Sequence, residues 1–352
     1  MGHLMPKSLP LVGLLLLGGC AGFGQSVPPP MVHPEGANII GRQQVVEATH
    51  EDTLIELARS HHLGYVELAA ANPGVDPWLP GEGTRIVLPT AHLLPPGEQT
   101  GIVINLAEQR LYYFDDETGP KSFAIGVGRE GADTPLGKTK VVRKREDPTW
   151  HPPASARRED PSLPRSVPPG PENPLGDRAL YLGWPAYLVH GTNEPYGIGR
   201  RVSRGCIRLY PEDIRALYPM VTKGTAVRVI DEPVKIQEVQ GELYLEAHPS
   251  LQQASQIEES GQFEPEPVPE VRERLVAAAG DSADLLNWPA IEEALASRRG
   301  IPVRITLGPG EVAAVPPLET ENDDLLSSLG NRLLGAWTEL TSTTTAEADG
   351  RE

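Results

Sequence analysis

One histidine and one cysteine in the middle of the chain have the types and the setting of a catalytic pair. His190 ends an apolar run, and Cys206 follows Gly205 after a glycine-rich stretch. A strand ending in a histidine, a flexible loop and a cysteine after a glycine are the parts of a pair in which the imidazole activates the thiol. The thiolate is the nucleophile, and we expect it to be favoured by four nearby arginines, Arg200, Arg201, Arg204 and Arg208.

Gly205 also bears on the transition state of such a reaction. Glycine lets the backbone turn tightly, so the amides of Gly205 and Cys206 are expected to point at a developing oxyanion. The alternative is that Cys206 is a small buried residue and His190 an ordinary polar one. The order and setting of the residues favour nucleophilic chemistry.

The segment from residue 188 to residue 213 resembles the active-site motif of the L,D-transpeptidase catalytic domain, the YkuD domain. That motif is roughly H-G, a loop, and then [S/T]-H-G-C-[I/V]-R. Arg204 departs from it, because the commonest family residue there is a second histidine, so no role is expected for a second imidazole. The matching residues are His190, Gly191, Ser203, Gly205, Cys206, Ile207 and Arg208.

The resemblance implies a mechanism on peptidoglycan stem peptides. His190 takes the proton of Cys206, or holds it as an ion pair, and the thiolate attacks a stem-peptide carbonyl to form a thioester. An amine then attacks the thioester. The backbone carbonyl of Gly191 is expected to orient the imidazole, and the amides of Gly205 and Cys206 to hold the oxyanion.

Five residues are predicted to contact the substrate. Arg208 either holds a stem-peptide carboxylate through two hydrogen bonds or forms a structural ion pair with Glu212 or Asp213. The proline-rich segment 144–176 is expected to line the substrate groove, as a comparable loop does in the family; the alternative is a surface insertion. The five predicted substrate contacts are Arg208, Ser203, Arg204, Trp150 and Tyr196.

Three functions remain open at this stage. The first is a transpeptidase with an amine acceptor, either a stem peptide or a lysine of a cell-wall-anchored lipoprotein. The second is a cysteine hydrolase (a carboxypeptidase or amidase) on the same substrate, which differs only in whether water reaches the thioester. The third is a non-catalytic peptidoglycan-binding lipoprotein, which the presence of both His190 and Cys206 disfavours.

Residues 43–90 predict a small strand–helix–helix–strand module. Apolar residues at helical spacing follow Thr53, which is suited to cap the helix. A second helix ends before Asn72 and Pro73, and a strand follows. This pattern resembles a LysM module, which binds the glycan of peptidoglycan; the alternative is a small helical spacer. The resemblance implies glycan contacts at Asp52, Thr53, Asn72 and Pro73.

The whole chain is predicted to be a multidomain α+β protein. Residues 99–231 should form the mainly β, sandwich-like catalytic domain, and 232–250 a β-hairpin extension. Residues 251–352 are acidic and predicted to be partly helical and partly disordered. The glycines near residue 128 satisfy G-x-G-x-x-G, but a strand and not a helix should follow, so no nucleotide cofactor is expected.

The N-terminus predicts export. Residues 1–20 have a short apolar run that ends in Leu-Gly-Gly-Cys, which resembles a lipobox; the alternative is an ordinary signal peptide. Lipidation of Cys20 would anchor the protein to a membrane, and residues 21–42 would form a linker. With no Asp after Cys20, the resemblance implies the periplasm and attachment to the outer membrane.

Charge and composition exclude other classes. The net charge of −17 argues against a nucleic-acid partner. One of the two cysteines is assigned to lipidation and the other to catalysis, so no disulfide framework is expected. Three histidines near the module, His50, His61 and His62, have no converging ligands in the sequence, so we expect no metal site.

Overall fold

The structure is a computed structural model that describes residues 37–115, 117–308 and 310–311. The predicted signal peptide with Cys20, most of the predicted linker and the chain beyond residue 311 lie outside the described residues. Across the described ranges, no helix combines the length and the apolar character needed to cross a membrane.

The N-terminal module has two strands and two helices. Strand β2 (Gln44–Glu47) pairs antiparallel with β3 (Arg85–Leu88), and the helices α1 (Leu54–Ser60) and α2 (Tyr65–Ala71) lie between them in the chain. The Thr53 hydroxyl accepts the Glu56 N–H, as an N-cap residue does. The strand–helix–helix–strand order agrees with the sequence pattern, and the LysM assignment stays a prediction.

Part of the predicted linker is a strand. Strand β1 (Ile39–Gly41) pairs antiparallel with β4 (Ala91–Leu93). The expectation that residues 21–42 are all linker is therefore wrong for the last residues of that range. Ile39 and Leu93 are buried with Val239 and Tyr244 of the later hairpin, and that apolar burial explains the pairing.

The catalytic region is mainly β, as expected. Nine strands of the described chain form one sheet in the order β11-β7-β12-β10-β9-β8-β13-β5-β6, and β7 also pairs with β6. The strands are β5 (Gly101–Asn105), β6 (Arg110–Phe114), β7 (Lys121–Gly128), β8 (Gly137–Glu146), β9 (Arg178–Leu182), β10 (Leu188–His190), β11 (Arg201–Ser203), β12 (Ile207–Leu209) and β13 (Ala226–Ile230).

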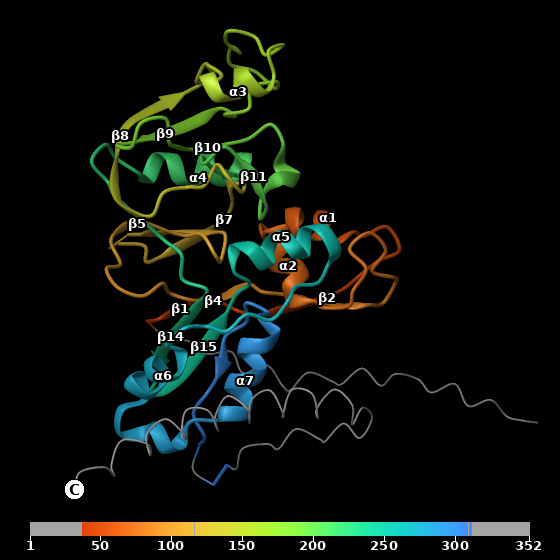
Figure 1. Cartoon of the computed structure of the whole chain (residues 1–352), viewed down its shortest axis with the longest axis vertical. Coiled ribbons are helices and arrows are strands. Elements are labelled where there is room, and N and C mark those ends of the chain that lie inside the picture. The colour runs from red at the N-terminus through yellow and green to blue at the C-terminus, as the bar shows by residue number, and fades with distance from the viewer. Residues whose placement is uncertain (1–36, 116, 309, 312–352) are drawn as a thin grey trace, which may run out of the picture. The chain divides into compact units, whose positions relative to one another are not determined.

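The two longest strands fold this sheet over into a sandwich-like pair of layers. The first half of β7 pairs with β6, and its second half pairs with β12 and β11. Likewise β8 pairs first with β13 and then with β9, with an irregularity between Val141 and Arg143. Apolar side chains of both layers meet in one core, which helix α4 (Pro211–Met220) covers through Ile214 and Leu217 (Figure 1).

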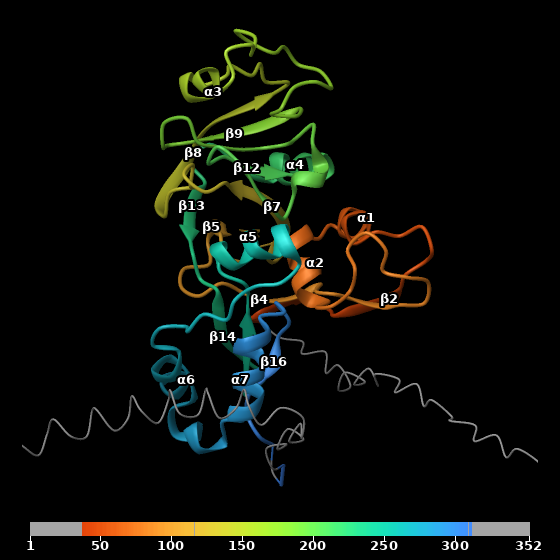
Figure 2. The same cartoon turned by 45° about the vertical axis from the view of Figure 1, so that its right-hand side comes forward.

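The proline-rich segment is ordered. Helix α3 (Ala154–Glu159) lies within it, and Trp150 forms a bridge with Val167. The buried side chain of Asn173 donates to the carbonyls of Pro148 and Pro168. Figures 1 and 2 show α3 beside the ends of β8 and β9. The segment therefore has a defined structure within the catalytic region.

The chain after residue 231 adds a hairpin and several helices. Strands β14 and β15 form the predicted hairpin, and β16 extends it. Helix α5 lies against α2 in both views and shares an apolar cluster with it (Figure 2). The elements are β14 (Val234–Val239), β15 (Glu242–Ala247), α5 (Leu251–Ser260), α6 (Val271–Ala279), η2 (Gly280–Leu285), α7 (Trp288–Ser297) and β16 (Val303–Arg304).

A buried ionic cluster joins the hairpin to the catalytic sheet. Lys235 is fully buried, and its ammonium lies 2.8 Å from Glu108 Oε1 and 3.0 Å from Glu246 Oε1. His248 Nε2 lies 2.7 Å from Glu246 Oε1, and Tyr112 donates to Glu108. Buried charges persist in proteins when they are paired in this way.

Candidate active site

Strand pairing brings the cysteine and the histidine together. His190 is the last residue of β10, and Cys206 comes directly before β12. These strands are parallel neighbours, with Val189 opposite Ile207 and His190 opposite Arg208. The glycine-containing loop between them is long enough to make the parallel return. The sequence therefore sets the pair on adjacent strands of one layer.

A backbone carbonyl orients the imidazole. His190 Nδ1 lies 2.6 Å from the Gly191 carbonyl oxygen. A carbonyl only accepts, so Nδ1 carries the proton and Nε2 is left as the base. This is the contact expected for Gly191. A Cβ at Gly191 would lie 3.1 Å from Ile214 Cγ2 and 3.4 Å from the Leu175 carbonyl, so the position suits glycine.

Burial makes both partners neutral. Burial and the nearby Arg208 lower the pKa of His190 to about 4, against the hydrogen bond with Gly191, which raises it. Burial also raises the pKa of Cys206, although the Leu188 backbone and Arg208 oppose the rise. At neutral pH the resting pair is therefore a thiol and an unprotonated imidazole. An ion pair, one of the two expected states, is disfavoured.

The expectation that four arginines favour the thiolate holds for one of them, because Arg200, Arg201 and Arg204 do not act on the pKa of Cys206. Arg208 is the arginine that lowers the pKa of Cys206, and burial outweighs it. The other three arginines form ion pairs, Arg200 with Glu258 (2.9 Å), Arg201 with Asp133 (3.0 Å) and Arg204 with Glu159 (2.8 Å).

The thiol itself points to the backbone. Cys206 Sγ lies 3.5 Å from the carbonyl oxygen of Ala186, to which it donates. Activation of the thiol by His190 would require this proton to turn from the carbonyl to Nε2. Catalytic hydrogen bonds are often loose without substrate and tighten in the complex.

The loop before Cys206 is held by its own hydrogen bonds. Gly205 has φ +95° and lies against Tyr187, where a Cβ would come within 2.8 Å of the ring, so glycine is required. Its N–H donates to Ser203 Oγ at 3.1 Å, and Ser203 Oγ donates to the Cys206 carbonyl at 2.6 Å. Thr134 Oγ1 donates to the Gly205 carbonyl at 3.0 Å.

These bonds correct two predictions. The Gly205 amide is already engaged, so it does not point at an oxyanion in this structure. Ser203 is buried and braces the loop, so it is not a substrate contact. The sequence reasoning did not assign a role to Thr134, which lies three residues after Gly131, the last glycine of G-x-G-x-x-G.

Arg208 has a different partner from the two expected. Its guanidinium lies 3.6 Å from Glu194, which sits in the loop between His190 and Cys206. Glu212 pairs instead with Arg59, and Asp213 with His62 at 2.9 Å. The predicted ion pair to Glu212 or Asp213 is therefore wrong. Because Glu194 lies in the loop between His190 and Cys206, this contact keeps the Arg208 guanidinium close to both residues.

The residue that departs from the family motif fastens the proline-rich segment. Glu159 of α3 accepts from Arg204 Nη2 at 2.8 Å and from Arg129 Nη2 at 2.9 Å. Arg204 therefore contacts the segment that also carries Trp150, which is half-buried at its bridge with Val167.

Tyr196 faces the N-terminal module. It lies in η1 (Pro195–Gly197), is 50% exposed, and lines a hollow of about 640 Å³ with residues of α1 and the turns beside it. The hollow brings Tyr196 together with Asp52, two residues predicted for separate sites. Its lining is Glu51, Asp52, Glu56, Arg59, Ser60, His62 and Tyr196.

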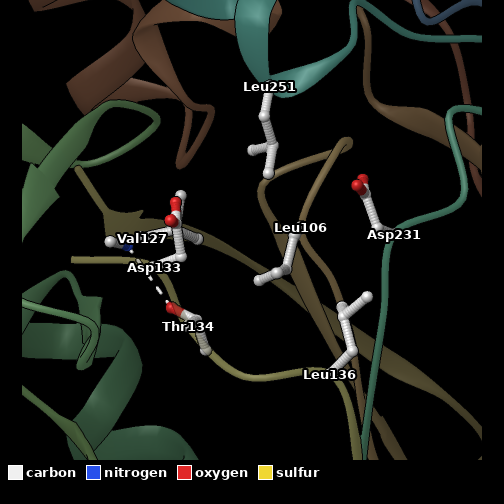
Figure 3. A pocket seen from close by; sticks show the side chains of 8 residues that line it. Leu106, Val127, Asp133, Thr134, Leu136, Asp231 and Leu251 are labelled. Carbon is white, nitrogen blue, oxygen red and sulfur yellow. Dashed lines mark hydrogen bonds between the residues drawn. The ribbon is translucent and has the colours of Figure 1, made fainter. Parts of the chain in front are cut away.

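A small pocket lies beside the catalytic loop. It has a volume of about 150 Å³, and Thr134, which bonds the Gly205 carbonyl, is one of its walls (Figure 3). Leu251, the first residue of α5, closes it from the other side. The lining is Leu106, Val127, Gly128, Asp133, Thr134, Leu136, Asp231 and Leu251.

The predicted glycan contacts differ in their surroundings. Asn72 is buried, and its amide bonds the backbone of Leu68 and Val87, so it fastens the module and does not reach a glycan. Thr53 and Asp52 lie at the start of α1. The sequence reasoning missed Trp78, which is 65% exposed in the loop that bonds Leu54 through Pro77.

Two clusters of the described residues have the ligand types for a metal ion, His62–Glu212–Asp213 and His92–Glu108–Glu246. In each cluster, a positively charged side chain of the protein already pairs with the carboxylates. Arg59 contacts Glu212, and Lys235 lies between Glu108 and Glu246. The geometry does not call for a metal.

Comparisons with known proteins identify the family of this chain. The L,D-transpeptidase catalytic domain model, YkuD, matches residues 99–235. The probable L,D-transpeptidase ErfK/SrfK of Salmonella typhimurium is 40% identical over 284 residues, which cover 78% of this chain and 90% of that protein. The probable L,D-transpeptidase YbiS of Escherichia coli is 40% identical over 280 residues, with 77% and 90% covered.

An NMR structure of the catalytic domain of an E. faecium L,D-transpeptidase aligns with 39% of this chain and all of that chain, at 27% identity and a TM-score of 0.31. The family assignment rests on the sequence relatives. The chain belongs to the L,D-transpeptidases with a YkuD domain. Within them it is similar to the ErfK and YbiS proteins, and the family predicted from the motif is confirmed.

Proposed function

We propose that this protein is an L,D-transpeptidase that acts on peptidoglycan stem peptides through a thioester at Cys206. The observation that supports the proposal is the parallel pairing of β10 and β12, which puts His190 opposite Arg208 and Cys206 two residues before Arg208 on the neighbouring strand. The bond from His190 Nδ1 to the Gly191 carbonyl adds to it, because this bond leaves Nε2 as the base.

The chemistry proceeds through proton transfers at Nε2. The neutral imidazole takes the thiol proton as sulfur attacks the carbonyl, and the oxyanion is assigned to the Cys206 amide. The C–N bond then breaks, and the imidazolium gives its proton to the leaving amine, which in the family is D-Ala. An acceptor amine attacks the thioester, loses a proton to His190, and releases the thiol.

The substrate contacts assigned to the site are Arg208, Arg204 and Trp150. Arg208 supplies a charge for a stem-peptide carboxylate, and Glu194 is the residue that it would exchange for the substrate. Trp150 lies in the ordered proline-rich segment, and Arg204 holds that segment next to the motif by its hydrogen bond to Glu159. Tyr196 is assigned to the glycan side, because it lines the hollow against α1.

The test is mass spectrometry of muropeptides after purified sacculi are incubated with the full chain. Cross-linked dimers that lack one D-Ala, formed by the protein and absent with Cys206→Ala, are the expected result. Shortened stems without dimers would replace the transpeptidase with a hydrolase on the same pair. Identical profiles from both proteins, with sacculi still bound, would leave a non-catalytic binding protein.

We also propose that the protein is attached to the outer membrane by a lipid and to peptidoglycan by its N-terminal module. Lipidation of Cys20 would hold the protein at the outer membrane, and a LysM-like module would bind glycan through Asp52, Thr53, Pro73 and the exposed Trp78. A lipoprotein lysine then becomes an available acceptor amine. Globomycin-sensitive processing and loss of membrane association in Cys20→Ala test the anchor; retention of Trp78→Ala on sacculi at the unaltered level would contradict the glycan contact.

A further inference from the structure

Helix α5 reaches the segment that carries the catalytic cysteine, although it lies beyond the YkuD match, which ends at residue 235. Its Glu258 is only 13% exposed at the side chain. One carboxylate oxygen accepts from Arg200 Nε at 2.9 Å, and the other accepts from the Arg201 backbone N–H at 3.0 Å. A single carboxylate thus holds two consecutive residues.

Arg201 gathers further contacts around this point. Its side chain is 9% exposed. It donates to the Leu251 carbonyl at 3.1 Å and to Ser255 Oγ at 3.2 Å, both on α5. It also donates to Asp133 at 3.0 Å and to the Gly128 carbonyl at 3.3 Å. Helix α5, β7 and the loop of Asp133 therefore meet at one guanidinium.

The anchored segment runs directly into Cys206. Strand β11 begins at Arg201 and stands at one end of the sheet order, with β7 as its neighbour. Their pairing is short and shifts register between Arg201 and Ser203. Backbone bonds hold β11 to the neighbouring chain, from Val127 N–H to the Arg200 carbonyl and from Arg129 N–H to the Ser203 carbonyl. With so short a ladder, the side-chain contacts from α5 add a second support to this edge strand.

Helix α5 is itself held firmly enough to act as a support. Ser250 caps it, with a hydroxyl that accepts the Gln253 N–H. Its Ala254 and Ile257 are buried against α2. The view in Figure 2 shows α5 beside α2, away from the hairpin strands.

We propose that Glu258 is a positioning residue for the reaction: through Arg200 and Arg201 it fixes the approach of the segment that presents the Cys206 thiol to His190. This inference rests on the proposed cysteine mechanism. Glu258 touches no reacting atom, so it acts on the turnover step, where a small displacement of the nucleophile has a large effect.

The test compares Glu258→Ala, Glu258→Gln and Glu259→Ala in the full chain. Glu259 is the exposed neighbour on the same helix and serves as the matched control. We measure kcat and KM for D-Ala release from a stem tetrapeptide, and the rate of Cys206 alkylation by iodoacetamide between pH 5 and 9, following the Cys206 peptide by mass spectrometry.

For Glu258→Ala we expect kcat to fall about tenfold or more with KM within about twofold, and the pH dependence of alkylation to shift. Glu258→Gln keeps an oxygen for the Arg201 N–H and should recover part of kcat. Glu259→Ala should match the unmodified protein.

Equal kcat and equal alkylation profiles for Glu258→Ala and Glu259→Ala would overturn the inference. So would a loss of kcat that is fully explained by a smaller folded fraction in thermal unfolding. The proposed function is tested separately, because activity that survives Cys206→Ala would refute the cysteine mechanism whatever Glu258 does.

Discussion

At the scale of the residue, burial keeps His190 and Cys206 neutral, so the base of the proposed mechanism is unprotonated before substrate arrives. The imidazole has a fixed tautomer through Gly191, and its low pKa keeps it unprotonated well below neutrality. Ser203 and Thr134 hold the loop on both sides of Gly205. Each of these features has a measurable consequence for pH dependence.

The acid limb of activity should lie near pH 4. The folded pKa of His190 is about 4, so above that pH the imidazole is unprotonated and can act as a base. The unfolded chain binds this proton below about 6.5, so stability also declines as pH falls from 6.5 to 4. kcat/KM is measured from pH 3.5 to 8, with tryptophan fluorescence confirming the folded state. An acid limb near 6.5 in folded protein would contradict the assignment.

At the scale of the element, the N-terminal module is built against the catalytic loop. The first N–H groups of α2, from Tyr65 and Val66, donate to the carbonyls of Ile198 and Gly199. Tyr210 donates to the Leu63 carbonyl at 2.9 Å, and Arg59 bonds Glu212. The module therefore contacts the chain on both sides of Cys206.

Gly199→Ala should separate these elements. Gly199 has φ +73°, and a Cβ there would lie 2.1 Å from Gly64 Cα, which is backbone and cannot move aside. We expect a loss of roughly 2–4 kcal/mol in urea unfolding. Gly224→Ala is the control, because Gly224 has φ +100° with open space around it, and should cost about 1 kcal/mol. Equal losses would show that the contact with α2 is unimportant.

The proline-rich segment should loosen in Glu159→Gln. The variant weakens the contacts to Arg129 and Arg204, and exposed ion pairs contribute little to global stability, so unfolding should change by less than about 1 kcal/mol. Trypsin should cut faster at Arg157, Arg158 and Arg165. Glu172→Gln, an exposed change in the same segment, should leave the cleavage rate unaltered. Unchanged cleavage in Glu159→Gln would contradict the fastening role.

At the scale of the whole molecule, buried charges connect segments far apart in sequence. Lys235 of the hairpin pairs with Glu108 in the turn between β5 and β6, and Arg110 of β6 bonds Glu67 of the module at 3.1 Å. Burial raises the pKa values of Glu108 and Glu246, but Lys235 and the neighbouring histidines hold both below their ordinary values. The described hairpin and module are thereby joined to the sheet through groups that are costly to leave unpaired.

Lys235→Met should lose about 3–5 kcal/mol at pH 7, because Glu108 and Glu246 lose their common partner. Their pKa values then rise, so the variant should recover part of this loss as the pH falls and the carboxyls are protonated. Urea unfolding at pH 5 and pH 7 measures the difference. Lys223→Met, at an exposed site, is the control. A deficit that grows toward pH 5 would contradict the pairing.

Local sequence patterns predicted the strands, helix α1 and the candidate site residues. They did not predict contacts between residues far apart in the chain. Apolar alternation and capping residues marked the strands and α1, and the motif spacing identified His190 and Cys206. The partner of Arg208 was missed, because ion pairs are chosen in space among many carboxylates. The engagement of the Gly205 amide by Ser203 depends on a turn geometry that the residue types alone do not specify. Helix α5 was not predicted as an element, because residues 251–352 were expected only to be partly helical and partly disordered. Its contact with Arg200 joins residues far apart in the chain.

Strand β7 has partners on both sides that are synthesised at very different times. Residues of β6, which pairs with the first half of β7, precede it. Strands β11 and β12 flank its second half on opposite sides and are made about 80 residues later, so both edges of that half stay open until the chain has passed the cysteine. The late strands are also the ones on either side of Cys206, the proposed nucleophile. A ribosome-bound or truncated chain therefore offers an unpaired edge to chaperones and no organised thiol, so reactivity appears only once the sheet has closed.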